Sequence, residues 1–419
     1  MFNKNVNYDA IIVGGGHAGL TMAVALAKLG FRLAVIAPVK VTQKVADKGD
    51  GRALAISEAP RRMLDLLGIW QRLDGKFQSM DKVNILDGKP GNILQDALLE
   101  FNTDANDGDA TAVAQVVESG HLLGAMWDAA QEEANIDFKI GRSLKSFTSD
   151  ANKTDLTLDD GTLLSASLII AADGRASLVR KELGIQTYGW GYGQTAIVCP
   201  VTHEKPHLGA AYEHFYPSGP FASLPLPDGV NGEHRSSLVW ADTPEFAKQL
   251  MEGDDGFFNT EMVKRFGLHL GEVKLCGDKF SYPLGLQIAY DYIKQRAVLI
   301  GDAAHGIHPI AGQGLNMGLR DIAVLSQVMA EARNLGLDFA GYTVLNKYQQ
   351  WRRFDVLTHA AFADVINRLF SNDIAPIRFV RDLGLKLVDG MAPVKKFFNA
   401  EASAQSGDLP AMLKGEYPS

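Results

Sequence analysis

Residues 8–19, with the sequence YDAIIVGGGHAG, decide the fold. The first half is an apolar run rich in β-branched residues, which predicts a buried strand. A GxGxxG glycine pattern follows at once, and residues 20–29 are rich in Ala and Leu, which predicts a helix that ends at Gly30. Residues 31–36 predict a second buried strand. The chain therefore opens as a βαβ unit with two parallel strands.

The three glycines of this turn have separate tasks. Gly14 permits the tight turn, Gly16 lets a pyrophosphate approach the backbone, and Gly19 lets helix and strand pack closely. The phosphates then meet free N–H groups at the positive end of the helix. A chance cluster of glycines is the alternative, but its position between a strand and a helix favours dinucleotide binding.

The usual acid that binds the adenosine ribose is missing. It should lie near the end of the second strand, where the sequence has Ala37 and Pro38. We therefore expect backbone groups or Asp47, in the following loop, to hold the ribose.

Composition limits the functions open to the chain. With 419 residues, 46% hydrophobic and 21% charged, it is long enough for two or three domains, or for one large α/β domain with an insertion. Its net charge of −8 argues against nucleic-acid binding. The two cysteines, Cys199 and Cys276, form no disulfide framework, and neither a signal peptide nor an 18-residue apolar run is visible. We expect a cytoplasmic location without a membrane span.

The next elements follow from local patterns. Helices are expected over residues 57–67, with Ser57 as N-cap, and over 121–133, and a hairpin turns at Asp159-Asp-Gly161 before a strand at 168–171. Residues 40–51 are interpreted as a loop and residues 87–112 as a loop-rich excursion. From 186 to 285 aromatic residues, prolines and short alternating stretches predict an antiparallel sheet. Residues 297–300 return to the buried-strand pattern, 315–333 are helical, and the chain from 342 onward is mostly helical.

These patterns predict how the chain is divided into domains. We expect a dinucleotide-binding domain in two parts, 1–185 with an excursion at 75–115 and 286–335. An antiparallel domain is inserted at 186–285, and a helical C-terminal region occupies 336–419.

A second motif lies at residues 171–180, AADGRASLVR. A buried strand ends at Asp173 and Gly174, and Ser177 stands just before a helix. By itself this pattern fits an ordinary β-turn with a capping serine as well as a nucleotide site.

The third motif, GDAAHGIHPIAGQGLNMGLRD at residues 301–321, is the most informative. Asp302 follows a buried strand and can accept hydrogen bonds from sugar-like hydroxyls. Gly312 and Gly314 bring the backbone close to a flat ligand, and the N-terminus of the next helix stabilises negative charge, as on the pyrimidine side of a reduced flavin. His305 and His308 have no third ligand nearby in the sequence, so we expect structural roles and no metal.

Taken in order, the three motifs resemble those of class A FAD-dependent aromatic hydroxylases. Residues 308–321 resemble the signature of the ubiquinone-biosynthesis (UbiH-type) family. Residues 50–57, DGRALAIS, resemble its early Arg-containing loop, and 369–372 and 381–385 resemble its tail. The sequence departs from that family at Ala37 and at Ser119-Gly120, where an Asn or Arg is usual.

The resemblance implies an α/β fold: a Rossmann-like FAD-binding domain of the GR2 type with a parallel sheet, an inserted antiparallel substrate domain and a helical C-terminal region. It implies that NADH or NADPH reduces FAD and that the flavin C4a-hydroperoxide formed with O₂ hydroxylates a polyprenylated phenol in ubiquinone biosynthesis. It places Pro309 near oxygen transfer, and we name His308 and Gln313 beside it as candidate catalytic residues. The expected FAD-binding residues are Gly14, Gly16, Gly19, Arg52, Asp173, Gly301, Asp302, Gly312, Gly314, Leu315 and Asn316.

The substrate and partners are less specified. Aromatic residues of the inserted sheet could line a pocket, although core positions are the simpler interpretation: Tyr212, His214, Phe215, Tyr216 and Phe221. Residues 347–396 carry nine Lys or Arg and five Asp, a basic region that could meet an anionic inner-membrane surface or other ubiquinone-biosynthesis proteins. A solvated helix face is the simpler alternative. Three functions compete with the leading one: hydroxylation of another phenol, a non-catalytic scaffold of a biosynthetic complex, and a flavin reductase or dehydrogenase.

Overall fold

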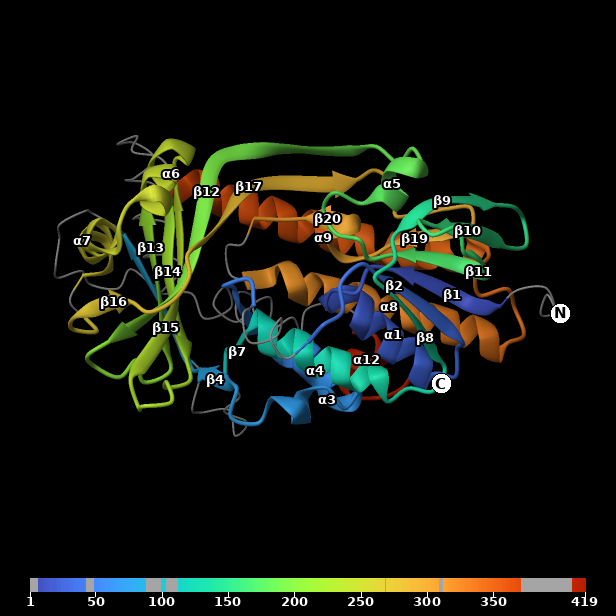
Figure 1. Ribbon diagram of the computed structural model, residues 1–419, viewed down its shortest axis with the longest axis horizontal. Coiled ribbons are helices and arrows are strands. Elements are labelled where there is room, and N and C mark those ends of the chain that lie inside the picture. The colour runs from blue at the N-terminus through green and yellow to red at the C-terminus, as the bar shows by residue number, and fades with distance from the viewer. Residues whose placement is uncertain are drawn as a thin grey trace.

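The computed structural model describes residues 7–42, 49–87, 99–102, 112–267, 269–308, 312–370 and 409–419. Figure 1 shows an elongated molecule with two lobes, one around a largely parallel sheet near the N-terminus and one around a larger antiparallel sheet. The predicted α/β fold with an antiparallel sheet and a helical C-terminal region is confirmed.

The first sheet has the strand order β18-β19-β11-β1-β2-β8. The strands are β1 (Tyr8–Val13), β2 (Leu33–Ala37), β8 (Ile136–Ile140), β11 (Leu163–Ala171), β18 (Ile293–Lys294) and β19 (Ala297–Leu299). β1 pairs in parallel with both β2 and β11, and β11 pairs in parallel with β19. The predicted βαβ opening is therefore confirmed. The hairpin of β9 (Leu144–Ser149) and β10 (Thr154–Leu158) extends the sheet beside β11.

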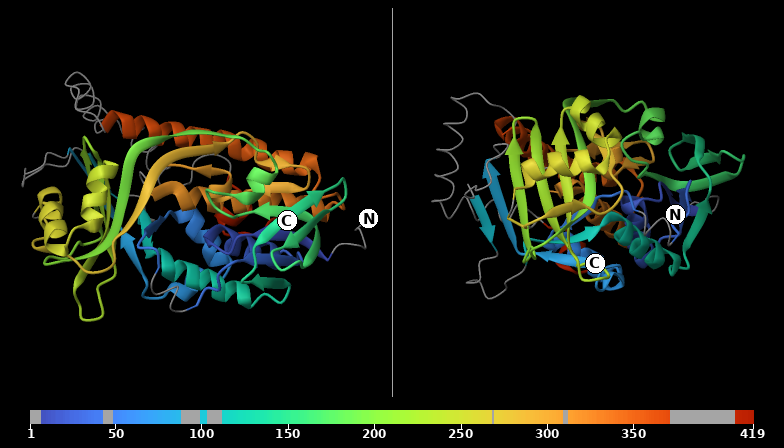
Figure 2. Two further views of the ribbon diagram at one scale, coloured as in Figure 1. Left: turned by 45° about the horizontal axis from the view of Figure 1, so that its top comes forward. Right: turned by 60° about the vertical axis from the view of Figure 1, so that its left-hand side comes forward.

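Helices pack on this sheet and on one another. They are α1 (His17–Lys28), α3 (Glu58–Leu66), α4 (Ser119–Gln131), α5 (Leu178–Glu182), α8 (Gln313–Asn334), α9 (Tyr342–Phe370) and α12 (Ala411–Lys414), with short 3-10 turns η1 (Trp70–Leu73) and η2 (Gly301–Ala303). α1 lies between α4 and α8, and α8 packs against α9. Figure 2 shows α9 running along the molecule from the first lobe toward the second sheet, where it contacts β14.

The second sheet has the order β20-β17-β12-β15-β14-β13-β5-β6. Its strands are β5 (Lys82–Asp87), β6 (Leu99–Asn102), β12 (Thr187–His203), β13 (Ala210–Tyr216), β14 (Gly219–Leu226), β15 (His234–Asp242), β17 (Phe280–Ala289) and β20 (His305–Gly306), with β16 (Val273–Leu275) beside β12. The long strands β12 and β17 run from this sheet toward the first lobe (Figure 1). Helices α6 (Pro244–Glu252) and α7 (Asp255–Phe266) cover its outer face.

Part of the excursion belongs to this second sheet. β5 pairs in parallel with β13, and β6 pairs antiparallel with β5. The excursion that the sequence predicts as loop-rich over residues 87–112 therefore contains a strand at residues 99–102. β6 pairs with β5, and β5 is held in the sheet by β13, a strand more than a hundred positions away that local patterns cannot reveal. A three-stranded sheet of β3 (Ala53–Ile56), β7 (Ala114–Glu118) and β4 (Phe77–Met80) lies between the lobes.

Element boundaries differ modestly from the predictions. α1 starts at His17, three residues earlier than expected, so the helix begins directly behind Gly16. α8 starts at Gln313, because Gly312 at its N-cap adopts the left-handed conformation with φ 64°. The predicted tail segment 381–385 lies outside the described residues.

Candidate functional site

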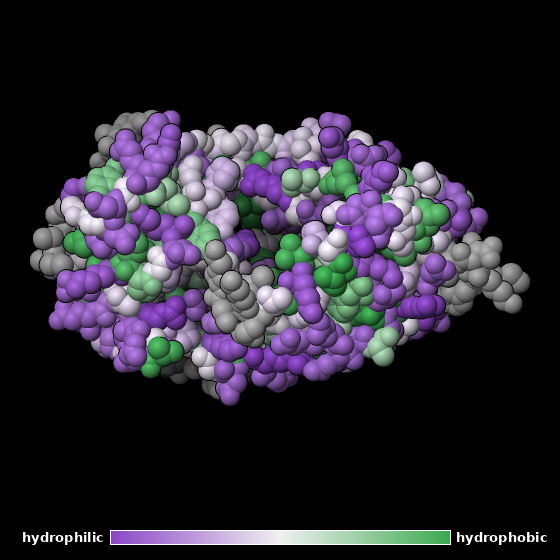
Figure 3. All heavy atoms as spheres, viewed as in Figure 1, coloured by the Kyte–Doolittle hydropathy of each residue, from purple (hydrophilic) through white to green (hydrophobic). Residues whose placement is uncertain are grey.

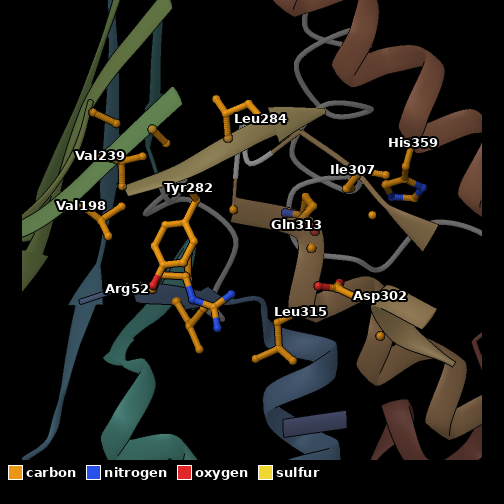
Figure 4. Close-up of a pocket in the computed structure, with 18 of the residues that line it drawn as sticks. Arg52, Val198, Val239, Tyr282, Leu284, Asp302, Ile307, Gln313, Leu315 and His359 are labelled. Atoms are coloured by element: carbon orange, nitrogen blue, oxygen red, sulfur yellow. The ribbon is translucent and has the colours of Figure 1, made fainter. Parts of the chain in front are cut away.

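A cavity of about 1260 Å³ joins the two lobes. One end is formed by the glycine turn before α1, the Arg52 loop, the turn after β19 and the start of α8, and the other by the inner face of the second sheet. Figure 3 shows the hollow between the lobes with apolar side chains at its floor. In Figure 4, Asp302, Gln313 and Leu315 lie across the cavity from Val198 and Val239.

The glycine turn leaves no room for side chains at two of its three positions. Gly14 has φ 121°, and a Cβ on it would lie 2.2 Å from the Ala172 carbonyl oxygen. A Cβ on Gly19 would lie 1.9 Å from the Gly14 oxygen, so helix and strand pack backbone to backbone. Gly16 faces open space in the cavity, and no side chain caps the N–H groups of α1 behind it. This end suits a bound anion.

The end of β2 carries no acid. Ala37 is fully buried, and a Cβ on Gly15 would lie 2.6 Å from the Ala37 Cβ. Asp47 lies outside the described residues, so the ribose contact stays a prediction.

The turn after β19 places Asp302 in the cavity. Gly301 has φ 56°, which a residue with a side chain adopts only with strain. Asp302 follows it, exposed, as part of the cavity lining. The backbone of Gly312, Gly314 and Leu315 lines the same end, and no side chain caps the N-terminus of α8. The uncapped, positive end of this helix favours a ligand with negative charge.

A buried ionic network holds this turn in place. The Asp321 carboxylate accepts hydrogen bonds from the Gly301 amide at 2.8 Å and from Arg352 Nε at 2.6 Å, and its Oδ2 lies 2.7 Å from His305 Nε2. Arg352 also pairs with Asp355. Burial by itself raises the pKa of Asp321, but His305 and Arg352 outweigh it and hold the pKa below its usual value. Asp321 and Arg352 received no role from the sequence, because they are 31 positions apart.

The second motif forms a tight capping arrangement. The Asp173 carboxylate accepts hydrogen bonds from the amides of Leu178 and Val179 and from the Ser177 hydroxyl. Ser177 in turn accepts from the Arg180 amide, as predicted for a capping serine. Asp173 is not among the residues that line the cavity. Its role toward a cofactor stays a prediction.

The Arg52 loop also borders the cavity. Arg52 Nε donates to Asp50 at 2.8 Å, and its guanidinium lies 5.8 Å from the ring centre of Tyr282. The Tyr282 hydroxyl donates to the Asp50 carbonyl at 2.6 Å. Ser119 is one of the positions at which the sequence departs from the family pattern. The His17 ring forms a hydrogen bond with the Ser119 carbonyl at 3.0 Å, which ties the glycine turn to the start of α4.

The three candidate catalytic residues, His308, Pro309 and Gln313, do not all line the cavity among the described residues. Gln313 lines the cavity (Figure 4). His308 is fully buried outside the lining, with its Nε2 3.4 Å from Gln194 Oε1 and its ring edge-to-face with Tyr192. Burial lowers the pKa of His308 to about 4, so the ring is neutral at physiological pH. Pro309 lies outside the described residues.

Asn316 lies behind the cavity wall. Its side-chain amide donates to the Ala55 carbonyl at 2.9 Å and accepts from the Ser57 amide at 3.2 Å. It therefore fixes the start of α8 against the junction of β3 and α3. Direct contact of Asn316 with a cofactor stays a prediction.

Comparison with known proteins assigns the family. A family model described as FAD binding domain matches residues 7–356. The chain is 40% identical over 412 residues to the ubiquinone hydroxylase UbiL of Rhodospirillum rubrum, covering 98% of this chain and 93% of that protein. It is 33% identical over 394 residues to the 3-demethoxyubiquinol 3-hydroxylase of Escherichia coli, covering 93% and 96%. The chain belongs to the FAD-dependent aromatic hydroxylases of ubiquinone biosynthesis.

A solved structure supports the fold of the hydroxylase. The p-nitrophenol 4-monooxygenase PnpA from Pseudomonas putida superposes with a TM-score of 0.77, at 18% identity, over 94% of this chain and 97% of that chain. The family resemblance read from the sequence is confirmed, and the protein is an FAD-dependent aromatic monooxygenase.

The cavity of the hydroxylase fits FAD. The open backbone at Gly16 suits the pyrophosphate, Asp302 can accept hydrogen bonds from ribityl hydroxyls, and the uncapped N-terminus of α8 suits the pyrimidine edge of the flavin. Within the described residues, no three His, Cys, Asp or Glu side chains gather as a metal site, and no helix is long and apolar enough to cross a membrane.

The aromatic residues of the second sheet divide between its two faces. Phe215 lines the cavity from the inner face of β13, and Tyr212 borders both the cavity and the core beneath α6 and α7. Tyr216 and Phe221 belong to the core that the sheet forms with α6 and α7, and His214 packs edge-to-face against Phe221. The core interpretation is thus confirmed for Tyr216 and Phe221, with His214 packed beside them, while Tyr212 and Phe215 border the cavity as well as being packed in the sheet.

Proposed function

We propose that the hydroxylase inserts one oxygen atom of O₂ into the ring of a polyprenylated phenol, a ubiquinone precursor, with NADH or NADPH as reductant. One observation supports this proposal most directly: a single continuous cavity. One end of it is formed by the glycine turn, Asp302 and the start of α8, which suit FAD, and the other end is an apolar wall formed by the second sheet. A ring seated on the wall would face the flavin with little water between them. The names of the two relatives support the substrate class.

The bound flavin supplies electron transfer from the reductant and activation of oxygen. The protein supplies placement and electrostatics. The glycine turn would accept the pyrophosphate, Asp302 would hold the ribityl chain, and the N-terminus of α8 would stabilise negative charge on the pyrimidine side. Gln313 would contact the ligand from the first turn of α8.

The apolar wall suits a prenyl tail. Its lining side chains are short or branched hydrocarbons from five strands: Val83, Ile85, Ala196, Val198, Ala211, Ala222, Leu224, Val239 and Ala241. Each CH₂ that leaves water contributes about 0.8 kcal/mol. We therefore expect affinity to grow with the length of the tail.

We assign the reductant to the mouth of the cleft. Arg175 is exposed, lines the cavity, and makes no ion pair with any described residue. A guanidinium in this position suits a phosphate of NAD(P)H. With one dinucleotide fold already used by FAD, this second nucleotide would bind transiently.

We also propose a cytoplasmic protein with peripheral contact to the inner membrane or to other proteins of the pathway. The basic region is weaker support than its composition implies, because Arg352 is buried in the Asp321 network. Residues 371–396 of this region lie outside the described residues. Deleting them and measuring recovery with anionic vesicles tests the contact, and unchanged recovery would reject it.

A product assay tests the function. The FAD-loaded protein is supplied with NADH or NADPH, O₂ and a series of phenols that differ in prenyl length, and products are identified by mass. The proposal expects a gain of one oxygen and higher kcat/KM with longer tails. Equal activity on phenols without a prenyl tail would indicate that the natural substrate is another phenol. NAD(P)H consumption without an oxygenated product would favour a reductase, and a colourless protein that stays so after FAD is added would indicate a scaffold.

A further inference from the structure

Glu213 faces the cavity from β13, an inner strand of its wall. Along β13, Ala211, Glu213 and Phe215 line the cavity, as the alternation of side chains in a strand requires. The residues opposite Glu213 on the two neighbouring strands are Ile85 and Ala222, and both also line the cavity. A carboxyl group therefore stands in a hydrocarbon wall.

In the part of the chain that the structure describes, no charged partner accompanies Glu213. Among the described residues that line the sheet wall, Glu213 is the one acidic or basic side chain. The tyrosines of the cavity are Tyr188, Tyr212 and Tyr282, and its other ionisable groups lie on the cofactor side or on α9: His17, Arg52, Arg175, Asp302 and His359. Burial raises the pKa of Glu213 to about 7, and burial is the one cause of that shift. No described group therefore stabilises the carboxylate.

Such a residue costs stability when it is ionised. A carboxylate without a hydrogen-bond donor in an apolar environment is unfavourable, and any apolar residue would suit this wall better. Glu213 weakens the fold when it is ionised, yet its side chain faces the cavity. This combination indicates that the carboxyl group interacts with a ligand. The ligand must offer a hydrogen-bond donor, because no described residue of the wall donates one to Glu213.

We propose that Glu213 accepts the hydrogen bond of the substrate's phenolic hydroxyl and removes its proton. This inference rests on the proposed function. In the step the O–H bond breaks, its electron pair stays on the phenolate oxygen, and the proton moves to a carboxylate oxygen of Glu213. No electron is gained or lost, and the proton returns to the product before release. The phenolate ring is richer in electrons and is a better acceptor for the incoming oxygen atom.

A pKa near neutrality suits this task. A general base is most effective when its pKa lies near the working pH, and such catalysis contributes about 10²–10⁴-fold in rate. The carboxylate form of Glu213 would bind and deprotonate the phenol, while the neutral acid would bind it less tightly.

The test replaces the carboxyl by an amide of the same shape. Glu213→Gln keeps the polar contact but cannot take a proton, Glu213→Asp keeps the base at a shorter reach, and Glu252→Gln, on the exposed end of α6, is the matched control. We expect unchanged FAD content and unchanged flavin reduction without substrate in all three. For Glu213→Gln, kcat for oxygenation should fall about 10²-fold and lose its rise through the pKa, with partial recovery in Glu213→Asp.

Binding gives an independent readout. With 4-pentylphenol as probe, the affinity of the FAD-loaded wild type, measured by calorimetry, should rise about tenfold from one pH unit below that pKa to one above, because a charge-assisted hydrogen bond is stronger. The affinity of Glu213→Gln should stay flat.

The two readouts separate the two claims. If the wild type makes no oxygenated product but probe binding follows pH through Glu213, the proposed function fails and the assignment of Glu213 to the phenol stands. If product forms equally well in the wild type and in Glu213→Gln, with the same pH profile, the inference about Glu213 is overturned.

Discussion

Replacement of Asp321 by Asn tests how the fold positions the cofactor end. The carboxylate is fully buried and is shared by the Gly301 amide, His305 and Arg352, all within 2.8 Å. The amide cannot neutralise Arg352, whose side chain is also fully buried. One cation would remain in the core with Asp355 as its remaining carboxylate partner.

The expected loss follows from that geometry. Removing one partner of a buried ion pair costs about 3–5 kcal/mol, and the remaining contact with Asp355 places Asp321→Asn near the lower end. The pKa of Asp321 is held below its usual value, so its stabilising contribution is present above the unfolded pKa and is lost as pH falls. The loss should also loosen the turn that carries Asp302, so we expect weaker retention of FAD.

Chemical unfolding monitored by flavin release and by far-UV circular dichroism measures this effect. Glu132→Gln is the control, because the Arg72–Glu132 pair has the same 2.6 Å separation as the Arg352–Asp321 pair but is exposed, and it should leave the unfolding midpoint unchanged. If Asp321→Asn loses no more stability than the control and keeps its flavin, the buried network does not hold the cofactor end.

Three further predictions follow from single positions. Gly14→Ala should give a colourless protein, because its Cβ would meet the Ala172 carbonyl, whereas Gly30→Ala, also at positive φ but with free space, should keep its FAD; a yellow Gly14→Ala protein would refute this. Glu213→Gln should stabilise the fold above about pH 7, where burial has raised the pKa of Glu213 from 4.5 to about 7. The penalty of the charged form grows as pH rises between those values and reaches about 1–3 kcal/mol after allowance for solvent in the cavity; equal unfolding midpoints of the variant and the wild type would argue against the shift. Arg175→Gln should raise KM for NAD(P)H about tenfold at unchanged FAD content, and an unchanged KM would remove Arg175 from the reductant site.

Local sequence patterns predicted the βαβ opening and the turns around the cofactor end of this protein. The strand, glycine turn and helix at residues 8–28 depend on neighbours in sequence, and their steric demands are visible in the glycines themselves. The turn with its capping serine at Ser177 followed from the same kind of rule. These features need no knowledge of distant contacts.

The remainder depends on contacts between distant residues. β5 joins the second sheet through β13, a partner more than a hundred positions away. Asp321 and Arg352 form one network although 31 positions separate them. Glu213 was missed because alternation along a strand says that a side chain faces one side, and the sequence does not say which side is the cavity. A lone acid in an apolar strand was the available signal.

Oxygen labelling tests the central claim most directly. The FAD-loaded protein is incubated with a prenylated phenol and NADH or NADPH under ¹⁸O₂ in ordinary water. The isotope content of the product is then measured by mass spectrometry. We expect one ¹⁸O atom in each product molecule, on the ring. A product that carries oxygen from water, or oxidation of NAD(P)H that leaves the phenol unlabelled, would contradict it.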